Sequence, residues 1–233
     1  MGRFFATTET TCNVAPMPIV AFAGQKGGVG KSTSALSVAC EWHANGKSVL
    51  VCDADPQGTA RTFAVVAAEE GNESPTIVGV GEGLERPDQV PKLSRAHDWT
   101  VIDCPPRMGK IQRAAMMIAD LVILPCGPST ADAWALAESV ALVNEARQVR
   151  PQLRAAVLLT RRVARTAIGD SAREVLAESG LPILKAELGY RTAYQEALAA
   201  GLGVSQYAPR TSAATEVRAL ARELERLSAG KTP

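Results

Sequence analysis

The feature that most constrains the fold of this chain is a glycine-rich segment of sequence GQKGGVGKST at residues 24–33. It follows Ile19 to Ala23, an apolar run with the length of a buried strand. It leads directly into Ser32 to Ala44, which has helical periodicity and is closed by Asn45-Gly46. The order of strand, glycine loop and helix predicts the opening unit of an α/β fold.

Beyond this unit, short apolar runs alternate with longer segments of helical period. The expected strands are Ile19 to Ala23, Val49 to Cys52, Thr100 to Ile102, Leu121 to Leu124, Ala155 to Leu159 and Ile183 to Leu184. The expected helices are Ser32 to Ala44, Thr59 to Ala68, Ala131 to Val149, Gly169 to Ser179, Thr192 to Ala199 and Ala213 to Leu227. This alternation predicts a mainly parallel, twisted β-sheet with helices on both faces.

The same pattern predicts a single folded domain over residues 18–228. A flexible N-terminal tail, residues 1–17, and a short C-terminal tail, residues 229–233, are expected to flank it. Residues 69–89, which are rich in glycine, form the least regular stretch and are expected to make a surface excursion.

Composition limits the classes of protein that this chain can be. Its 233 residues are 46% hydrophobic and 21% charged, which is enough for a full core, and its net charge of +1 announces neither a nucleic-acid nor a membrane partner. No apolar run approaches the roughly eighteen residues of a membrane-spanning helix, and Met1 to Pro16 lacks the apolar centre of a secretory signal. The cysteines form no CxxC pair and most lie in or beside apolar runs, which indicates reduced thiols in a soluble, cytoplasmic protein.

The glycine-rich segment has the residues that a phosphate-binding loop (P-loop) needs. Glycines let backbone N–H groups turn toward phosphate oxygens, and the helix N-terminus adds its positive dipole. Lys31 supplies a point charge and Ser32 a hydroxyl for magnesium. The usual pattern G-x-x-x-x-G-K-[ST] is broken, because Gln25 stands where the first glycine belongs. The expected nucleotide-binding residues here are Gly27, Gly28, Val29, Gly30, Lys31, Ser32 and Thr33.

Three aspartates stand at the ends of predicted strands. Asp53 and Asp55 are two positions apart, so an extended chain points both to the same side, where they can face the phosphates. Asp103 follows the apolar run that ends at Ile102. Carboxylates can anchor the hydration shell of magnesium and hold an attacking water, so the three predict a nucleotide-hydrolysing site.

The run Gln25 to Thr33 resembles the deviant Walker A box of the ParA/MinD superfamily of P-loop ATPases. The resemblance implies that Lys26 reaches across a dimer to the partner's nucleotide, so that hydrolysis depends on pairing. Asp53-Ala54-Asp55-Pro56-Gln57-Gly58 is similar to the family's D-x-D-P-Q-G segment, which implies that Asp55 positions the attacking water with Asp53 in support. Asp103-Cys104-Pro105-Pro106 resembles the Walker B element, which implies that Asp103 holds magnesium through water. The expected magnesium residues are Ser32, Asp53 and Asp103, with the two aspartates acting through water.

The likeness covers about residues 18–228 and favours a small ParA of the partition branch. Gln25 resembles the N-Q-K-G-G opening of partition ATPases, and Ala213 to Leu227 interleaves arginine and glutamate without a bulky apolar face for a membrane. Only residues 1–17 precede the first strand, so no N-terminal DNA-binding domain is expected. The resemblance implies ATP and Mg²⁺ as cofactors, weak intrinsic hydrolysis, an ATP-bound homodimer and a ParB-like or other adaptor that stimulates hydrolysis.

The C-terminal third suggests contacts to adenine and to DNA. By resemblance, Thr160, Arg161 and Pro209 flank the base. Residues 147–173 carry seven arginines against one acid, Asp170, a net charge of +6. Such a patch predicts salt-sensitive, sequence-independent DNA binding, and hence association with the nucleoid in the ATP-bound form. The expected DNA contacts are Arg161, Arg162, Arg165, Arg191 and Arg210.

Other functions remain open from the sequence. A MinD-like ATPase that acts on a membrane or protein scaffold is the main alternative, and a P-loop ligase of the dethiobiotin-synthetase kind is more distant because Lys26 and the Asp55-Pro56-Gln57 segment oppose it. Cys104 and Cys126 are the conceivable iron–sulfur ligands but are expected to be buried, and His43 and His97 are expected to be structural. The resemblance to ParA implies that hydrolysis serves to segregate or position a cargo, either a plasmid, a chromosome region or a protein assembly, and the sequence does not identify which.

Overall fold

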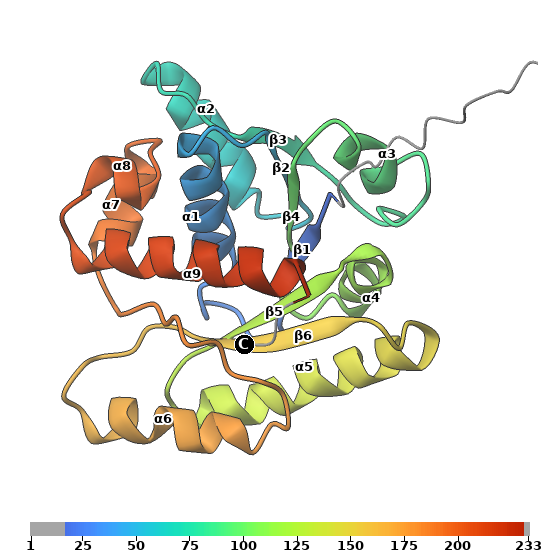
Figure 1. Ribbon diagram of the computed structural model, residues 1–233, viewed down its shortest axis with the longest axis vertical. Coiled ribbons are helices and arrows are strands. Elements are labelled where there is room, and N and C mark those ends of the chain that lie inside the picture. Colours follow the sequence, from blue (N-terminus) through green and yellow to red (C-terminus); the bar gives the residue numbers. More distant parts are fainter. Residues whose placement is uncertain (1–16, 231–233) are drawn as a thin grey trace, which may run out of the picture.

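A single parallel β-sheet organises the chain. The computed structural model describes residues 17–230, so most of the predicted N-terminal tail and the last three residues lie outside the described range. Six strands follow the order β3-β2-β4-β1-β5-β6, and every pairing is parallel, as predicted (Figure 1). The strands are β1 Ile19–Phe22, β2 Val49–Asp53, β3 Thr76–Gly79, β4 Trp99–Asp103, β5 Leu121–Cys126 and β6 Arg154–Leu159.

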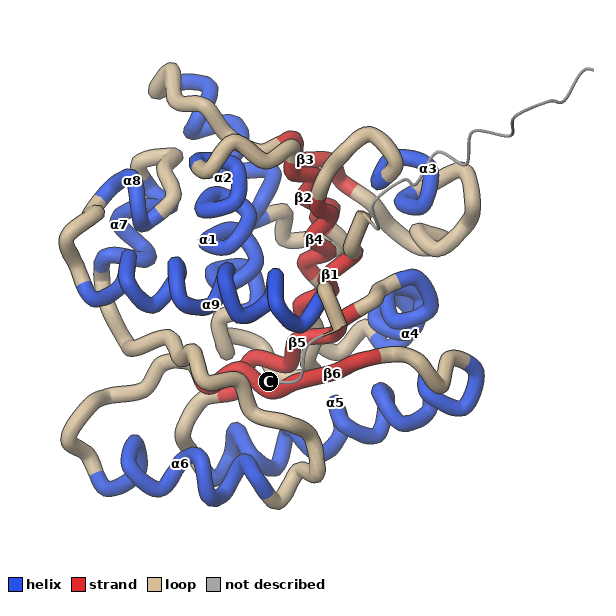
Figure 2. The backbone as a smooth tube through the Cα atoms, in the orientation of Figure 1, coloured by secondary structure: helices blue, strands red, loops and turns tan. Residues whose placement is uncertain are grey.

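Helices cover both faces of this sheet, which appears as a red layer between blue helices in Figure 2. One face packs against α1 Lys31–Ala44, α2 Thr59–Glu69, α7 Ala193–Ala199, α8 Val204–Tyr207 and α9 Ser212–Ser228. The opposite face packs against α3 Val90–Ser94, α4 Gly109–Ile118, α5 Thr130–Val149 and α6 Ala167–Ala177.

Alternation along the buried strands produces the two cores. In β1, Val20 and Phe22 point into the first core, whereas Ile19 and Ala21 point into the second. All four are buried, which explains why this strand is apolar without interruption.

The strand order brings the candidate site residues together at one edge of the sheet. β1 lies between β4 and β5, and Asp53 of β2 is in register with Asp103 of β4, which in turn is in register with Phe22 of β1. The carboxyl ends of these strands therefore place the glycine-rich loop, Asp53 and Asp103 side by side. Ligands of parallel sheets collect at such an edge, where the crossovers diverge.

Some predicted elements differ from the structure. Ile183 to Leu184 is not a strand but contributes one isolated parallel bridge, between Ile183 and Val157. The stretch 69–89 is not wholly irregular, because it contains the exposed edge strand β3. The helices α3, α4 and α8 were not predicted, since α3 and α8 are very short and α4 begins at a glycine without a side-chain cap.

The described residues also bear on the predicted membrane and thiol properties. No helix within residues 17–230 is long and apolar enough to cross a bilayer. Cys40, Cys52, Cys104 and Cys126 are free and buried, as expected for structural thiols, and burial raises the pKa of Cys40, Cys52 and Cys126 to about 12. Cys12 lies outside the described range.

Candidate nucleotide-binding site

A cavity of about 640 Å³ opens at the carboxyl edge of the sheet. Its phosphate end is lined by the predicted loop residues Gly27, Gly28, Gly30, Lys31, Ser32 and Thr33, and its far end by residues 188–191, 194 and 195. Asp55, Gln57 and Pro106 also contribute to the wall. A cavity of this size, lined by glycine backbone at a helix N-terminus, fits a nucleotide.

The glycine-rich loop is held in shape by its own glycines and by two neighbouring elements. Gly28 and Gly30 have φ values of 73° and 92°, which a side chain would resist, so the loop needs glycine at both positions. The Gln25 N–H donates to Ser139 Oγ (3.1 Å), and Thr160 Oγ1 donates to the Val29 carbonyl (2.8 Å). These contacts from α5 and the end of β6 preorganise the loop before a ligand arrives.

Lys31 points into this loop from the first turn of α1. It is buried, and its Nζ donates to the Lys26 carbonyl at 2.8 Å. Burial lowers its pKa, while Asp103, Cys104 and Asp55 oppose that shift. An ammonium group with so little water around it gains strongly from an anionic ligand.

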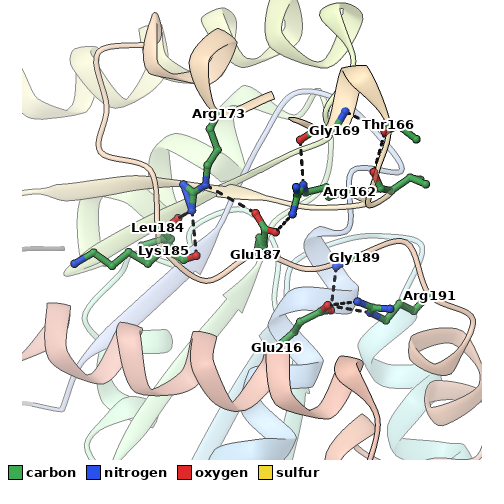
Figure 3. Close-up of polar contacts among 11 residues, drawn as sticks. Arg162, Thr166, Gly169, Arg173, Leu184, Lys185, Glu187, Gly189, Arg191 and Glu216 are labelled. Carbon is green, nitrogen blue, oxygen red and sulfur yellow. Dashed lines mark hydrogen bonds and ion pairs between the residues drawn. The ribbon is translucent and has the colours of Figure 1, made fainter. Parts of the chain in front are cut away.

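The far end of the cavity is held by two glutamates of α9. Glu216 accepts from the Gly189 N–H (3.0 Å), from Arg191 Nε (2.9 Å) and from Tyr194 Oη (2.8 Å). Glu223 is buried and accepts from the N–H groups of Lys185 (2.8 Å) and Ala186 (2.7 Å). The loop that precedes α7 is thus fixed to α9 at two points, and Figure 3 shows the first of them.

The predicted base contacts are only partly at this wall. Thr160 and Arg161 line the cavity, and the Arg161 guanidinium lies 5.8 Å from the centre of the Tyr190 ring. Pro209 is not among the described lining residues, and its carbonyl accepts from Arg218 instead. The cavity is also lined by four residues that were not predicted, namely Leu188, Tyr190, Tyr194 and Gln195.

Asp103 has a buried carboxylate whose surroundings suit a bound cation. It is fully buried, and neither carboxylate oxygen has a hydrogen-bond partner among the described residues. Burial raises its pKa to about 7; Asp53 and Asp55 add to the rise, whereas Ser32 and Lys31 oppose it. Two orphaned carboxylate oxygens beside the hydroxyl of Ser32 fit a hydrated magnesium ion, and the magnesium role of Asp103 and Ser32 stays a prediction.

This pKa predicts a pH-dependent stability. A folded-state pKa above the unfolded one favours folding at low pH, so the apo protein should lose stability from about pH 4 to pH 7 as Asp103 ionises. Asp103→Asn cannot ionise and should therefore gain stability relative to wild type over that range, by several degrees in Tm, with no further gain above about pH 7. Thermal unfolding in EDTA at several pH values measures this. A Tm difference that is constant with pH would contradict the assignment.

Asp53 and Asp55 lie in different surroundings. Asp55 lines the cavity, and its Oδ1 accepts from the Gln57 N–H at 2.9 Å. Asp53 is buried, and its oxygens already accept from the N–H groups of Asp55 (3.1 Å) and Arg61 (3.0 Å). The predicted magnesium role is thus better matched by Asp103 than by Asp53, whose visible task is to hold the loop that follows β2.

Comparisons with known proteins identify the family of this chain. The family model "CobQ/CobB/MinD/ParA nucleotide binding domain" matches residues 20–204. The chain belongs to this family. The Maintenance of carboxysome distribution protein A of Halothiobacillus neapolitanus is 30% identical over 210 residues, covering 88% of this chain and 95% of that protein. The chromosome-partitioning ATPase Soj of Thermus thermophilus is 28% identical over 237 residues, covering 88% and 94%.

The fold is shared with solved members of the family. MinD of Pyrococcus horikoshii complexed with Mg-ADP superimposes with a TM-score of 0.70 at 18% identity, over 92% of this chain and 98% of that one. The predicted resemblance to the ParA/MinD family is therefore confirmed.

Lys26, the other lysine of the ParA/MinD loop, is not among the described residues that line the cavity. Its Nζ lies 2.6 Å from Asp132 Oδ1, and its side chain is partly exposed. Asp132 and Ser129 form the capping box that begins α5. Burial opposes ionisation of Asp132, but Lys26 and Ser129 together lower its pKa. The partnership with Asp132 was not predicted.

The arginines predicted to contact DNA are less free than their number suggests. Arg162 pairs with Glu187 at 2.5 Å and Arg191 with Glu216 at 2.5 Å, as Figure 3 shows. Arg161 donates to the Gly28 carbonyl. Arg165 and Arg210 are exposed, and within residues 17–230 no hydrogen bond or ion pair of either side chain is found.

Other arginines of residues 147–173 donate hydrogen bonds to backbone carbonyls at the ends of helices. Arg150 donates to the carbonyls of Met116 (3.0 Å) and Ala119 (2.8 Å) at the end of α4, and Arg154 donates to the Leu227 carbonyl at the end of α9. Arg173 shares Glu187 with Arg162. The local charge of +6 therefore does not form one continuous surface of free cations.

Proposed function

We propose that this ParA-like chain is a magnesium-dependent ATPase that pairs on binding ATP and uses hydrolysis to position a cargo. The observation that carries the proposal is the division of the two loop lysines. Lys31 lies inside the cavity, whereas Lys26 is not among the described residues that line it and stands partly exposed beside it. This division supports a role for Lys26 at the nucleotide of a second copy rather than at its own.

The residues of one subunit divide the remaining tasks. The N–H groups of residues 27–33 and the ammonium of Lys31 hold the phosphates, and Ser32 and Asp103 hold magnesium. Magnesium, when bound, neutralises charge on the phosphates. Asp55 lines the cavity and orients the attacking water. Asp53 supports it through the loop.

Two relatives support a positioning role with different cargoes. One is named for carboxysome distribution and the other for chromosome partitioning. We propose that the cargo reaches the ATPase through an adaptor that stimulates hydrolysis, and that the ATP-bound pair binds DNA without sequence preference, with Arg165 and Arg210 as the free cations. The protein would then be cytoplasmic and associated with the nucleoid while ATP is bound.

A membrane-binding role like that proposed for the MinD-like alternative is less well supported. The apolar side chains of α9, including Val217, Leu220 and Leu224, are buried in the core and leave no apolar face for a bilayer. Liposome sedimentation tests this point. ATP-dependent binding to vesicles, with no binding to duplex DNA, would favour the alternative.

Gel filtration with ADP and with ATP tests the proposed cycle. A dimer with ATP and a monomer with ADP are expected, and only the dimer should sediment with nonspecific duplex, less so as salt rises. A protein that stays monomeric with either nucleotide contradicts the pairing. Equal DNA binding with ADP and ATP contradicts the switch.

Lys26→Ala separates nucleotide binding from pairing. Because Lys26 lies outside the cavity of its own subunit, ADP affinity should stay within about twofold of wild type. ATP-dependent dimerisation and hydrolysis should both be lost, the latter by about a hundredfold. Lys92→Ala, which removes an exposed lysine of α3, is the control and should change neither. Hydrolysis at the wild-type rate by Lys26→Ala would exclude a role in trans.

A further inference from the structure

The loop after β2 carries Asp55, and the buried carboxylate of Asp53 accepts hydrogen bonds from its backbone. Asp53 Oδ1 accepts from the Asp55 N–H, two residues on, and Oδ2 accepts from the Arg61 N–H, eight residues on. The first turn of the loop is completed by the Gly58 N–H, which donates to the Asp55 carbonyl at 2.9 Å. Both ends of the loop are therefore fixed to one buried carboxylate.

The half-exposed side chain of Arg61 also contacts this loop. Its Nε lies 3.4 Å from Asp53 Oδ2, and its Nη2 donates to the carbonyls of Asp55 (3.3 Å) and Pro56 (3.4 Å). The guanidinium thus spans the carboxylate that anchors the loop and the two residues at its turn. The side chain is half exposed, so its contribution is one of geometry more than of charge.

Two glycines make room for this side chain. A Cβ on Gly58 would lie 2.9 Å from Arg61 Nη2, and a Cβ on Gly79 in β3 would lie 3.0 Å from Arg61 Cδ. Gly58 also has a φ of 69°, whereas Gly79 has no such conformational need for glycine. The space at Gly79 is therefore explained by Arg61 alone.

We propose that Arg61 is a positioning residue for ATP hydrolysis, which holds the backbone of Asp55 so that its carboxylate faces the attacking water. The inference rests on the proposed ATPase function. Arg61 does not line the cavity among the described residues, so it acts through Asp55 and not on the nucleotide. Its planar fork reaches three acceptors at once, which the single nitrogen of lysine cannot do.

Steady-state hydrolysis by Arg61→Ala and Arg61→Lys tests the proposal. Both should lower kcat about tenfold or more, because small displacements of a catalytic group are costly, while ADP affinity and KM for ATP stay within about twofold. Arg86→Ala is the matched control, since Arg86 is also an exposed arginine that pairs with an aspartate and packs on a glycine of positive φ, Gly83. It should leave kcat unchanged.

A second measurement detects the effect on the loop without relying on activity. Amide hydrogen exchange in the apo protein should speed up at Asp55 and Gly58 in Arg61→Ala and stay unchanged in Arg86→Ala. Gly79→Ala should displace Arg61 and lower kcat, and combining it with Arg61→Ala should add nothing further.

The outcomes distinguish the inference from the function on which it rests. If the wild type hydrolyses ATP and Arg61→Ala has the same kcat, the positioning role is overturned and the proposed function is not. Full rescue by lysine, or an equal loss of ADP affinity and kcat, also overturns the positioning role. A wild-type protein that does not hydrolyse ATP under any condition overturns the proposed function and this inference together.

Discussion

Replacing Lys31 with alanine should abolish nucleotide binding. Lys31 is the buried cation of the cavity, and its ammonium donates to the Lys26 carbonyl until a phosphate replaces that acceptor. Burial strengthens its attraction for an anion, so a loss of ADP affinity of about a hundredfold or more is expected. Titration calorimetry with Mg-ADP measures the change.

Lys31→Ala should nevertheless fold. The substitution removes an ammonium group whose burial is unfavourable, as its lowered pKa shows, so the apo variant should unfold within a few degrees of wild type. Lys110→Ala, an exposed lysine of α4, is the control and should bind ADP normally. A loss of ADP affinity below tenfold in Lys31→Ala would mean that the cavity is not the phosphate site.

Replacing Asp55 should have the second large effect, on hydrolysis rather than on binding. Asp55 is one of the residues that line the cavity. Its removal should lower kcat about a hundredfold or more while the ATP-dependent dimer persists, because nothing then orients the attacking water. Single-turnover hydrolysis and gel filtration with ATP measure the two properties separately.

Asp55→Asn tests whether charge or turn geometry is responsible. An asparagine side chain can still accept from the Gln57 N–H, so it retains the turn that Asp55 makes in the structure. Asp55→Asn should therefore be as inactive as Asp55→Ala. Substantial activity in Asp55→Asn would show that the carboxylate charge is dispensable and that the residue serves only the loop.

The parallel sheet was predictable because its strands are buried on both faces. Two of these strands, Val49 to Cys52 and Leu121 to Leu124, are apolar without interruption, and a helical segment follows each of them. A parallel sheet covered by helices on both faces accounts for both observations. Elements without that signal were missed. β3 is an edge strand within a glycine-rich stretch, and the predicted strand at Ile183 forms a single bridge because the chain is held there by α9 as much as by β6.

The parts of the site that lie within short sequence motifs were predictable, whereas contacts between distant residues were not. The glycine loop, Lys31 and Asp103 follow directly from motif and strand position, and the structure brings them together. The ion pair of Lys26 joins residues 106 positions apart, and the wall containing Tyr194 is set by Glu216 on another helix. Periodicity carries no information about such contacts.

The arginine patch shows a different limit. Summing charge along residues 147–173 treats every guanidinium as available, but Arg150 and Arg154 serve helix ends and Arg162 has a glutamate partner. Which arginines are free depends on tertiary neighbours. DNA contact by Arg165 and Arg210 accordingly stays a prediction.

The two glutamates of α9 make the last helix an integral part of the nucleotide cavity. Substitutions that remove the carboxylates of Glu216 and Glu223, but keep the apolar side of α9 in the core, should release the wall formed by Gly189 to Tyr194 and leave the glycine loop in place. Such a protein would grip the phosphates but discriminate poorly between adenine and other bases. Selectivity for the base and attachment of this wall to the C-terminal helix are therefore expected to be gained and lost together.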